Sequence, residues 1–187
     1  MEEIEAITAV HHPVRRRIFD YLGLYGASQV GSLARALDQQ VGSISHHLRM
    51  LERAGIVERA DDPTGDKRTS WWQIARRSFS WSVDDFAGSP ADAMLARGAQ
   101  RANINAQIGR LSAWHRSSDP DPVWSRAAFN TDTLVWATAD ELAALSKAFV
   151  DTIAQWARSI DRDDESDESA SERRPVFVFA HGFPTTP

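Results

Sequence analysis

The feature that most constrains this fold is a change in the spacing of apolar residues at Gly55. Before it, residues 41–54 place apolar side chains at the helical intervals of three and four. After it, residues 56–59 alternate, residues 61–66 are rich in turn formers, and residues 69–74 have the composition of a returning strand. The pattern predicts a helix followed directly by a β-hairpin.

Helical spacing also precedes this segment. Residues 4–10 and 14–24 each have it, and Gly26 suits the end of the second helix. Residues 28–37 repeat the pattern, with Ser28 as the expected N-cap. Together with the hairpin, this order predicts a winged helix-turn-helix, in which the helix before Gly55 is the recognition helix.

The predicted recognition helix has an outward face of short and polar side chains. Its apolar residues Ile44, Leu48 and Leu51 share one side, which leaves the opposite side exposed. A helix that enters the major groove needs short side chains for close approach, and donors and acceptors for phosphates and base edges. The predicted DNA-binding residues of this helix are Gln40, Gly42, Ser43, Ser45, His46 and Arg49.

Each of these residue types suggests a role. We expect Ser43 and Ser45 to contact phosphate or sugar, His46 a base or a phosphate, and Arg49 a guanine or a phosphate. Gln40 stands at the entry of the helix, and the first turn of a recognition helix lies nearest the bases.

The hairpin tip adds three candidate DNA-binding residues, Lys67, Arg68 and Thr69, beside Gly65. A basic wing can reach the adjacent minor groove or its phosphates. An ordinary solvated hairpin has the same composition, so this alternative stays open.

Residues 9–75 resemble the ArsR/SmtB family of winged-helix transcription regulators. The resemblance rests on the segments HPVRRRIFDYL, SLARAL, VGSISHHLRMLERAGIVE and DPTGDKR. Its most specific part is Ser45-x-His47-Leu48-x-x-Leu51 followed by Ala54-Gly55, at the family's distance from His12-Pro13-x-Arg15. The resemblance implies a symmetric dimer that binds an inverted repeat and usually represses. It also implies structural roles for Arg15 and His47.

The chain departs from the metal-sensing members of that family. They carry two cysteines in the helix before the recognition helix, whereas this chain has no cysteine and has Gln29-Val30-Gly31-Ser32-Leu33 there. Its six histidines form no ligand pattern in the sequence. We therefore expect no metal site and no cofactor. No nucleophile elbow, phosphate-binding glycine loop or catalytic carboxylate pair is present, so we expect no catalytic residues and no enzyme activity.

A long helical stretch, residues 91–114, follows a connector, and small residues recur along it at intervals of three and four. Such a stripe permits close helix packing and predicts a homodimer interface. The predicted dimerisation residues are Leu95, Ala99, Ala102, Ala106 and Gly109.

The C-terminal part predicts a small α/β extension. Residues 139–159 have the pattern of an amphipathic helix, and residues 133–137 and 175–180 have the composition of strands that could pair. The expected fold class is mainly α (α+β): a winged helix-turn-helix, a long dimerisation helix and this extension. The expected domains are 1–77 for DNA binding, 78–160 for dimerisation or regulation, 161–174 as an acidic linker, and 175–187 as a strand and tail.

Charge and hydropathy limit the partners and the compartment. The net charge is -5, but residues 1–77 hold eleven Lys and Arg against ten Asp and Glu, whereas residues 161–187 hold three against seven. The local field, not the total, attracts phosphate, so the acidic balance is compatible with double-stranded DNA as partner. No apolar run could span a membrane, and the acidic N-terminus is unlike a signal peptide. We expect a cytoplasmic protein.

Two alternatives remain beside the sequence-specific regulator. A degenerate winged helix could instead dock a protein partner, since fold does not fix function. A DNA-binding regulator could also respond to a small molecule through a pocket lined by some of the seven tryptophans.

Overall fold

A computed structural model describes residues 2–61, 70–76, 81–117, 121–160 and 173–186. These residues form two compact units, 1–116 and 117–187. In the first unit the elements are α1 (Glu2–Val10), α2 (Pro13–Tyr25), β1 (Ser28–Gln29), α3 (Val30–Ala36), α4 (Val41–Arg53), β2 (Val57–Ala60), β3 (Trp71–Ile74), the short 3-10 helix η1 (Val83–Phe86) and α5 (Pro90–Arg116). The second unit holds α6 (Pro122–Ala127) and α7 (Ala139–Ser159).

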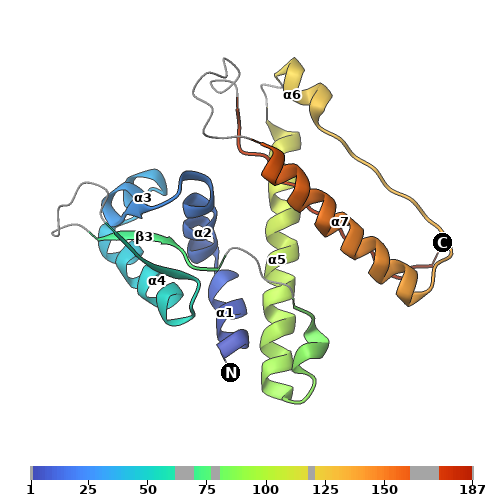
Figure 1. Ribbon diagram of the computed structural model, residues 1–187, viewed down its shortest axis with the longest axis horizontal. Helices are drawn as coiled ribbons and strands as arrows, with labels where there is room; N and C mark the ends of the chain where they lie inside the picture. Colours follow the sequence, from blue (N-terminus) through green and yellow to red (C-terminus); the bar gives the residue numbers. More distant parts are fainter. Residues whose placement is uncertain (1, 62–69, 77–80, 118–120, 161–172, 187) are drawn as a thin grey trace. The chain divides into compact units, whose positions relative to one another are not determined.

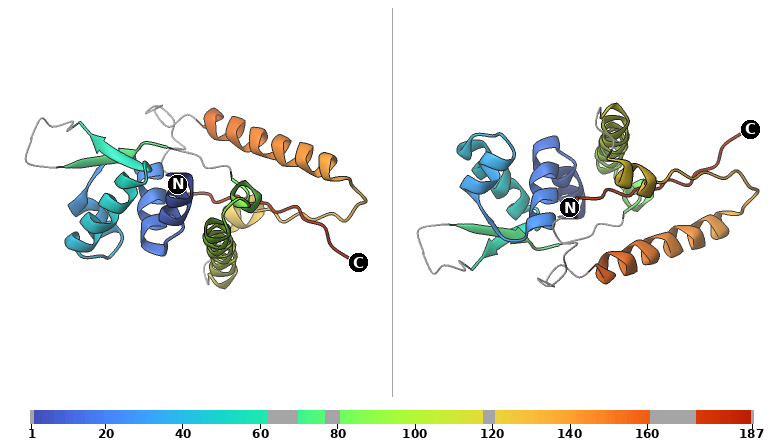
Figure 2. Two further views of the ribbon diagram at one scale, coloured as in Figure 1. Left: turned by 90° about the horizontal axis from the view of Figure 1, so that it is seen from below. Right: turned by 90° about the horizontal axis from the view of Figure 1, so that it is seen from above.

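The first unit is mainly helical with a small antiparallel sheet in the order β1-β3-β2 (Figure 1). β3 is the central strand, with Trp72 opposite both Ser28 of β1 and Arg59 of β2. Both views of Figure 2 place the β2–β3 hairpin along one side of α2, α3 and α4. This is a winged helix-turn-helix followed by a long helix, as the sequence predicts.

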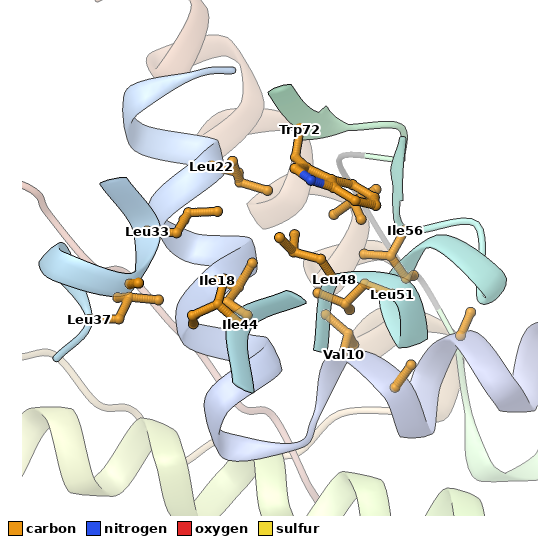
Figure 3. Close-up of a cluster of buried hydrophobic side chains, with 14 residues drawn as sticks. Val10, Ile18, Leu22, Leu33, Leu37, Ile44, Leu48, Leu51, Ile56 and Trp72 are labelled. Atoms are coloured by element: carbon orange, nitrogen blue, oxygen red, sulfur yellow. The ribbon is translucent and has the colours of Figure 1, made fainter. Parts of the chain in front are cut away.

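The core of this unit is built from the apolar faces of α1 to α4 and from the sheet (Figure 3). Ile18 of α2, Ile44 and Leu48 of α4, and Ile56 after α4 are fully buried, and the indole of Trp72 covers the sheet side of the cluster. Burying large apolar side chains is the main favourable contribution to folding. The same cluster therefore holds α4 against the domain.

Two glycines end helices in the way that the sequence indicates. Gly26 follows α2 with φ 74°, and Gly55 follows α4 with φ 66°. A positive φ costs little only in glycine, and it lets the chain leave each helix sharply. The N–H of Gly26 donates to the carbonyl of Leu22, which closes the last turn of α2.

One helix boundary differs from the prediction. Ser28 is not an N-cap: it lies in β1, is buried and pairs with Trp72, and α3 begins at Val30. Helical spacing could not show this, because the pairing partner of β1 lies more than forty residues away in the sequence.

The second unit corrects the prediction of two strands. Residues 133–137 and 175–180 belong to no strand. A strand requires a hydrogen-bonded neighbour, and the structure assigns no ladder to either segment. In addition α6 forms at a place where the sequence predicts no element, capped by the carboxylate of Asp121, which accepts from the N–H of Val123. The amphipathic helix lies over residues 139–159, as predicted, with a capping box between Thr138 and Glu141.

Candidate nucleic-acid interface

The turn between α3 and α4 is held by hydrogen bonds at each step. Asp38 adopts a left-handed φ of 51°, which turns the chain between the two helices. The N–H of Gln39 donates to the carbonyl of Ala34 at 2.9 Å, and the guanidinium of Arg17 donates to the carbonyl of Leu37 at 2.8 Å. These hydrogen bonds stabilise the turn between α3 and α4.

α4 separates an apolar face from a polar face. Ile44, Leu48 and Leu51 are fully buried in the core. On the opposite side of the helix, Gly42, His46 and Arg49 are exposed. Ser43 and Ser45 lie at the borders of the two faces and are half-buried. The structure thus gathers five of the predicted residues on and beside one surface of α4.

The entry of α4 presents backbone donors. Gln40 is its N-cap residue and is exposed, and its side chain makes no capping hydrogen bond. The first N–H groups of a helix have no partner within the helix, and they carry the positive end of the helix dipole. Gly42 adds no side chain over them, and a Cβ built there meets nothing within 4 Å. This end of α4 is open to an approaching phosphate or base.

His47 and Arg15 face inward, as the family resemblance implies. The ring of His47 lies 5.0 Å from that of His12, between centroids, and the Nδ1 atoms of both rings are buried without a hydrogen-bond partner. The guanidinium of Arg15 donates to the carbonyl of Ala9 at 2.6 Å, at the end of α1. Burial, then the charges of His12 and Arg15, lower the pKa of His47. These side chains join α4 to α1 and α2.

Two arginines extend the polar surface beyond the residues that the sequence singled out. Arg53 follows Arg49 by one helical turn and is exposed, and Arg35 is exposed at the end of α3. The four-residue spacing from Arg49 was the available signal for Arg53. Arg59 differs, because its guanidinium covers the Trp72 ring at 4.0 Å and pairs with Glu52.

The wing is described only in its strands. Val57 pairs with Ile74 and Ala60 with Trp71, so β2 and β3 form a regular hairpin. The candidate residues Lys67, Arg68 and Thr69 lie outside the described residues. Their roles remain predictions.

The five predicted dimerisation residues do not share one environment. Ala99 is buried within its own chain, where the first half of α5 packs against α1 and η1. Leu95, Ala102, Ala106 and Gly109 are exposed on α5. Asp20 of α2 pairs with Arg110, and Arg16 donates to Asn103, so α5 is fixed against α2 as well.

The aromatic residues are distributed over the chain. Trp72 belongs to the core of the winged domain, whereas the side chain of Trp136 in the second unit is fully exposed. The two cavities described are lined by residues of α1, α2, the α4–β2 junction and α5, together with Arg76, and no tryptophan contributes to either. Neither of these two cavities supports a tryptophan-lined effector pocket. In the described ranges, no cluster of three or more His, Asp or Glu side chains that could hold a metal occurs.

No helix of the described segments has both the length and the apolar character needed to cross a bilayer.

The half-buried His11 predicts a loss of stability in mild acid. Its ring packs against Trp81, and burial, with a smaller contribution from Arg16, lowers its pKa from 6.5 to about 4. Between pH 6.5 and pH 4 the His11 side chain is mostly protonated in the unfolded chain and mostly neutral in the folded domain. Stability is therefore complete above pH 6.5 and falls as the pH drops toward 4. The full shift corresponds to about 2 kcal/mol between pH 7 and pH 5, and because solvent screens this half-buried ring we expect a smaller loss, about 1 kcal/mol.

Urea unfolding at the two pH values measures this effect. His12 and His47 shift in the same direction, because burial lowers the pKa of both rings. The variant His11→Gln should reduce the difference between pH 7 and pH 5. An unchanged difference in that variant would contradict the assignment to His11.

A comparison with known proteins identifies the same region of the chain as a known domain. Residues 10–60 match the family model described as a helix-turn-helix domain. The search of the curated proteins finds no match. Among solved structures, the chain is similar to the crystal structure of a MarR family transcription regulator, with 18% identity, coverage of 85% of this chain and 82% of that chain, and a TM-score of 0.35. The chain therefore carries a helix-turn-helix domain, which β2 and β3 complete as a winged helix-turn-helix, the fold of DNA-binding transcription regulators.

Proposed function

We propose that this protein is a sequence-specific transcription regulator that binds double-stranded DNA as a homodimer on an inverted repeat, and that it represses. The observation that carries the proposal is the division of α4. Its apolar face anchors the helix in the core through Leu48. Its opposite face presents Gly42 at the open helix entry, and His46 and Arg49 in the following turns. That arrangement supports insertion of α4 into the major groove.

A dimer would supply the length of the binding site. Two-fold symmetric proteins of this fold contact half-sites about 34 to 36 Å apart, one turn of DNA. The exposed residues Leu95, Ala102, Ala106 and Gly109 of α5 support a helix-packing interface between two copies. Occupying an operator in this way blocks a promoter, which is the simplest route to repression.

Selection of bound fragments from the source organism's sheared genome tests the proposal. Wild type should enrich an inverted repeat at near-physiological salt, whereas the triple variant of Ser45, His46 and Arg49 to alanine should not. A double variant of the exposed α5 residues Gln100 and Arg101 to alanine removes the same formal charge and should enrich as wild type does.

Salt dependence gives a second criterion on the selected site. If each subunit neutralises several phosphates, affinity should fall by a factor of about a thousand or more between roughly 50 and 200 mM salt. A flat response, or equal enrichment by the triple variant, would count against DNA recognition by α4.

One observation favours a role in protein association as well. In the described part of residues 117–187 no side chain is buried, and Phe129, Trp136 and Val150 are largely exposed. Large exposed apolar side chains favour a role for this unit in an interaction surface. If wild type and the triple variant bound a protein partner equally and neither enriched DNA, the winged helix would be an interaction module.

A further inference from the structure

α7 carries a continuous apolar stripe that its own unit covers only in part: Leu142 is half-buried with Gly182 of the C-terminal segment against it, whereas Leu145 is exposed. The stripe consists of Leu142, Leu145, Phe149, Ile153 and Trp156. The exposed fractions are 60% for Leu145, 36% for Phe149 and 44% for Trp156, although these residues share one helix face. An amphipathic helix gains most of its stability from burying such a face, so a partner surface is required.

The stripe is symmetric about its central residue. Phe149 is the midpoint of α7, which runs from Ala139 to Ser159. Leu142 and Trp156 lie seven residues before and after it, and Leu145 and Ile153 lie four residues before and after it. An antiparallel copy of the same helix, related by a two-fold axis at Phe149, would therefore place Leu142 opposite Trp156 and Leu145 opposite Ile153.

The charges of α7 are also arranged for this pairing. The first turn is acidic, with Asp140 and Glu141, and the last turn carries Arg158. In an antiparallel pair the acidic end of one helix lies level with the basic end of the other, and the two helix dipoles oppose. A parallel pair would instead place like charges at the same level.

No charged pair must lose water to form this contact. Lys147 and Asp151 bind each other at 2.6 Å, and helical spacing places both on the side of α7 away from Phe149. Residues flanking the stripe are mostly small and uncharged, namely Ser146, Ala148, Val150, Thr152 and Ala157. The described residues of 121–160 and 173–186 contain five Lys or Arg and five Asp or Glu, so charge is balanced over this part of the unit; the excess of acidic residues in the unit lies mainly in residues 161–172, outside α7.

We propose that the apolar face of α7 is a self-association surface whose occupant is α7 of a second copy, antiparallel and centred on Phe149. It deepens the proposed function, because it adds a second contact to the homodimer at a distance in sequence from α5. Its two-fold axis is compatible with the symmetry that an inverted repeat demands.

Cysteine crosslinking tests this geometry directly, because the natural chain has no cysteine. The single substitution Phe149→Cys places two thiols at the axis, and mild oxidation should give a covalent dimer. The two copies of residue 142 would lie about 20 Å apart along the axis, given a rise of about 1.5 Å per residue. That is too far for a disulfide.

The off-axis variants distinguish the alternatives. Leu142→Cys alone and Trp156→Cys alone should not crosslink, whereas an equimolar mixture of the two, on chains with different tags, should form the mixed dimer. A parallel pair would crosslink each variant with itself and would overturn the proposal. So would an α7 that packs within its own chain, which would give no crosslink in any sample.

Thiol labelling and a second pair keep the test decisive. Phe149→Cys should react with a maleimide under reducing conditions; if it labels but does not crosslink, the proposal fails. Should Phe149→Cys not fold, Leu145→Cys mixed with Ile153→Cys asks the same question. The Ser45, His46, Arg49 triple alanine variant combined with Phe149→Cys should still crosslink, so failure to bind DNA and failure of α7 pairing are separate results.

Discussion

Replacing Gly42 by glutamate is expected to abolish operator binding while the domain stays folded. A side chain at this position meets nothing within 4 Å, and the residue is exposed in the first turn of α4. An acidic residue is favourable at a helix N-terminus, and losing glycine lowers the entropy of the unfolded chain. The melting temperature should therefore hold or rise.

The affinity of the Gly42→Glu variant for DNA should fall, although its melting temperature holds or rises. The new carboxylate would stand between the helix entry and the phosphates, where like charge costs several kcal/mol. We expect a loss of about a hundredfold or more, measured by fluorescence anisotropy on the selected operator. Gly88→Glu makes the same change at an exposed, open position outside the helix-turn-helix and should bind as wild type does. Normal DNA binding by the Gly42→Glu variant would contradict the proposal that α4 enters the major groove.

Replacing Trp72 by alanine is expected to cause the largest loss of stability. Trp72 is 2% exposed, lies on the central strand, and contacts the cluster that contains Leu48 and Ile56. Removing a large buried aromatic side chain from a core costs about 3 to 5 kcal/mol. The free energy of unfolding from urea titration should fall by that amount, and the wing should lose its support against α4.

Phenylalanine at the same position separates packing from hydrogen bonding. The indole Nε1 of Trp72 is buried and has no hydrogen-bond partner. Trp72→Phe removes that unsatisfied group along with part of the volume, and the two effects oppose. We expect a loss of only about 1 kcal/mol. A loss as large as that of alanine would show that a hydrogen bond of the indole stabilises the fold.

The outward residues of α4 were predictable because helical geometry alone determines them. Burial of Ile44, Leu48 and Leu51 directs Gly42, His46 and Arg49 outward by helical geometry alone. The structure refines this by placing Ser43 and Ser45 at the borders of the face. It also shows that Arg59, which has the same charge as Arg49, is engaged with Trp72 and Glu52.

The strands of the second unit were not predictable by the same means. Residues 175–180 have β-branched and aromatic side chains, but composition describes only suitability for a sheet. Whether a segment becomes a strand depends on a neighbour with which to form hydrogen bonds, and residues 133–137 do not supply that ladder. Ser28 is the opposite case. It was predicted as a helix cap, but it lies in a strand because β3 provides Trp72 as its pairing partner.

The sequence by itself therefore determined the longer helices, the hairpin strands and the outward face of α4, because each follows from periodicity and turn residues within about fifteen positions; it did not show α6 or η1. Only the tertiary structure decided the environments that depend on distant segments. It turned Ala99 inward against α1 and η1 while leaving Ala102 and Ala106 exposed. It also packed the half-buried ring of His11 against Trp81. Such choices follow from which surfaces meet, and that information is non-local in the chain.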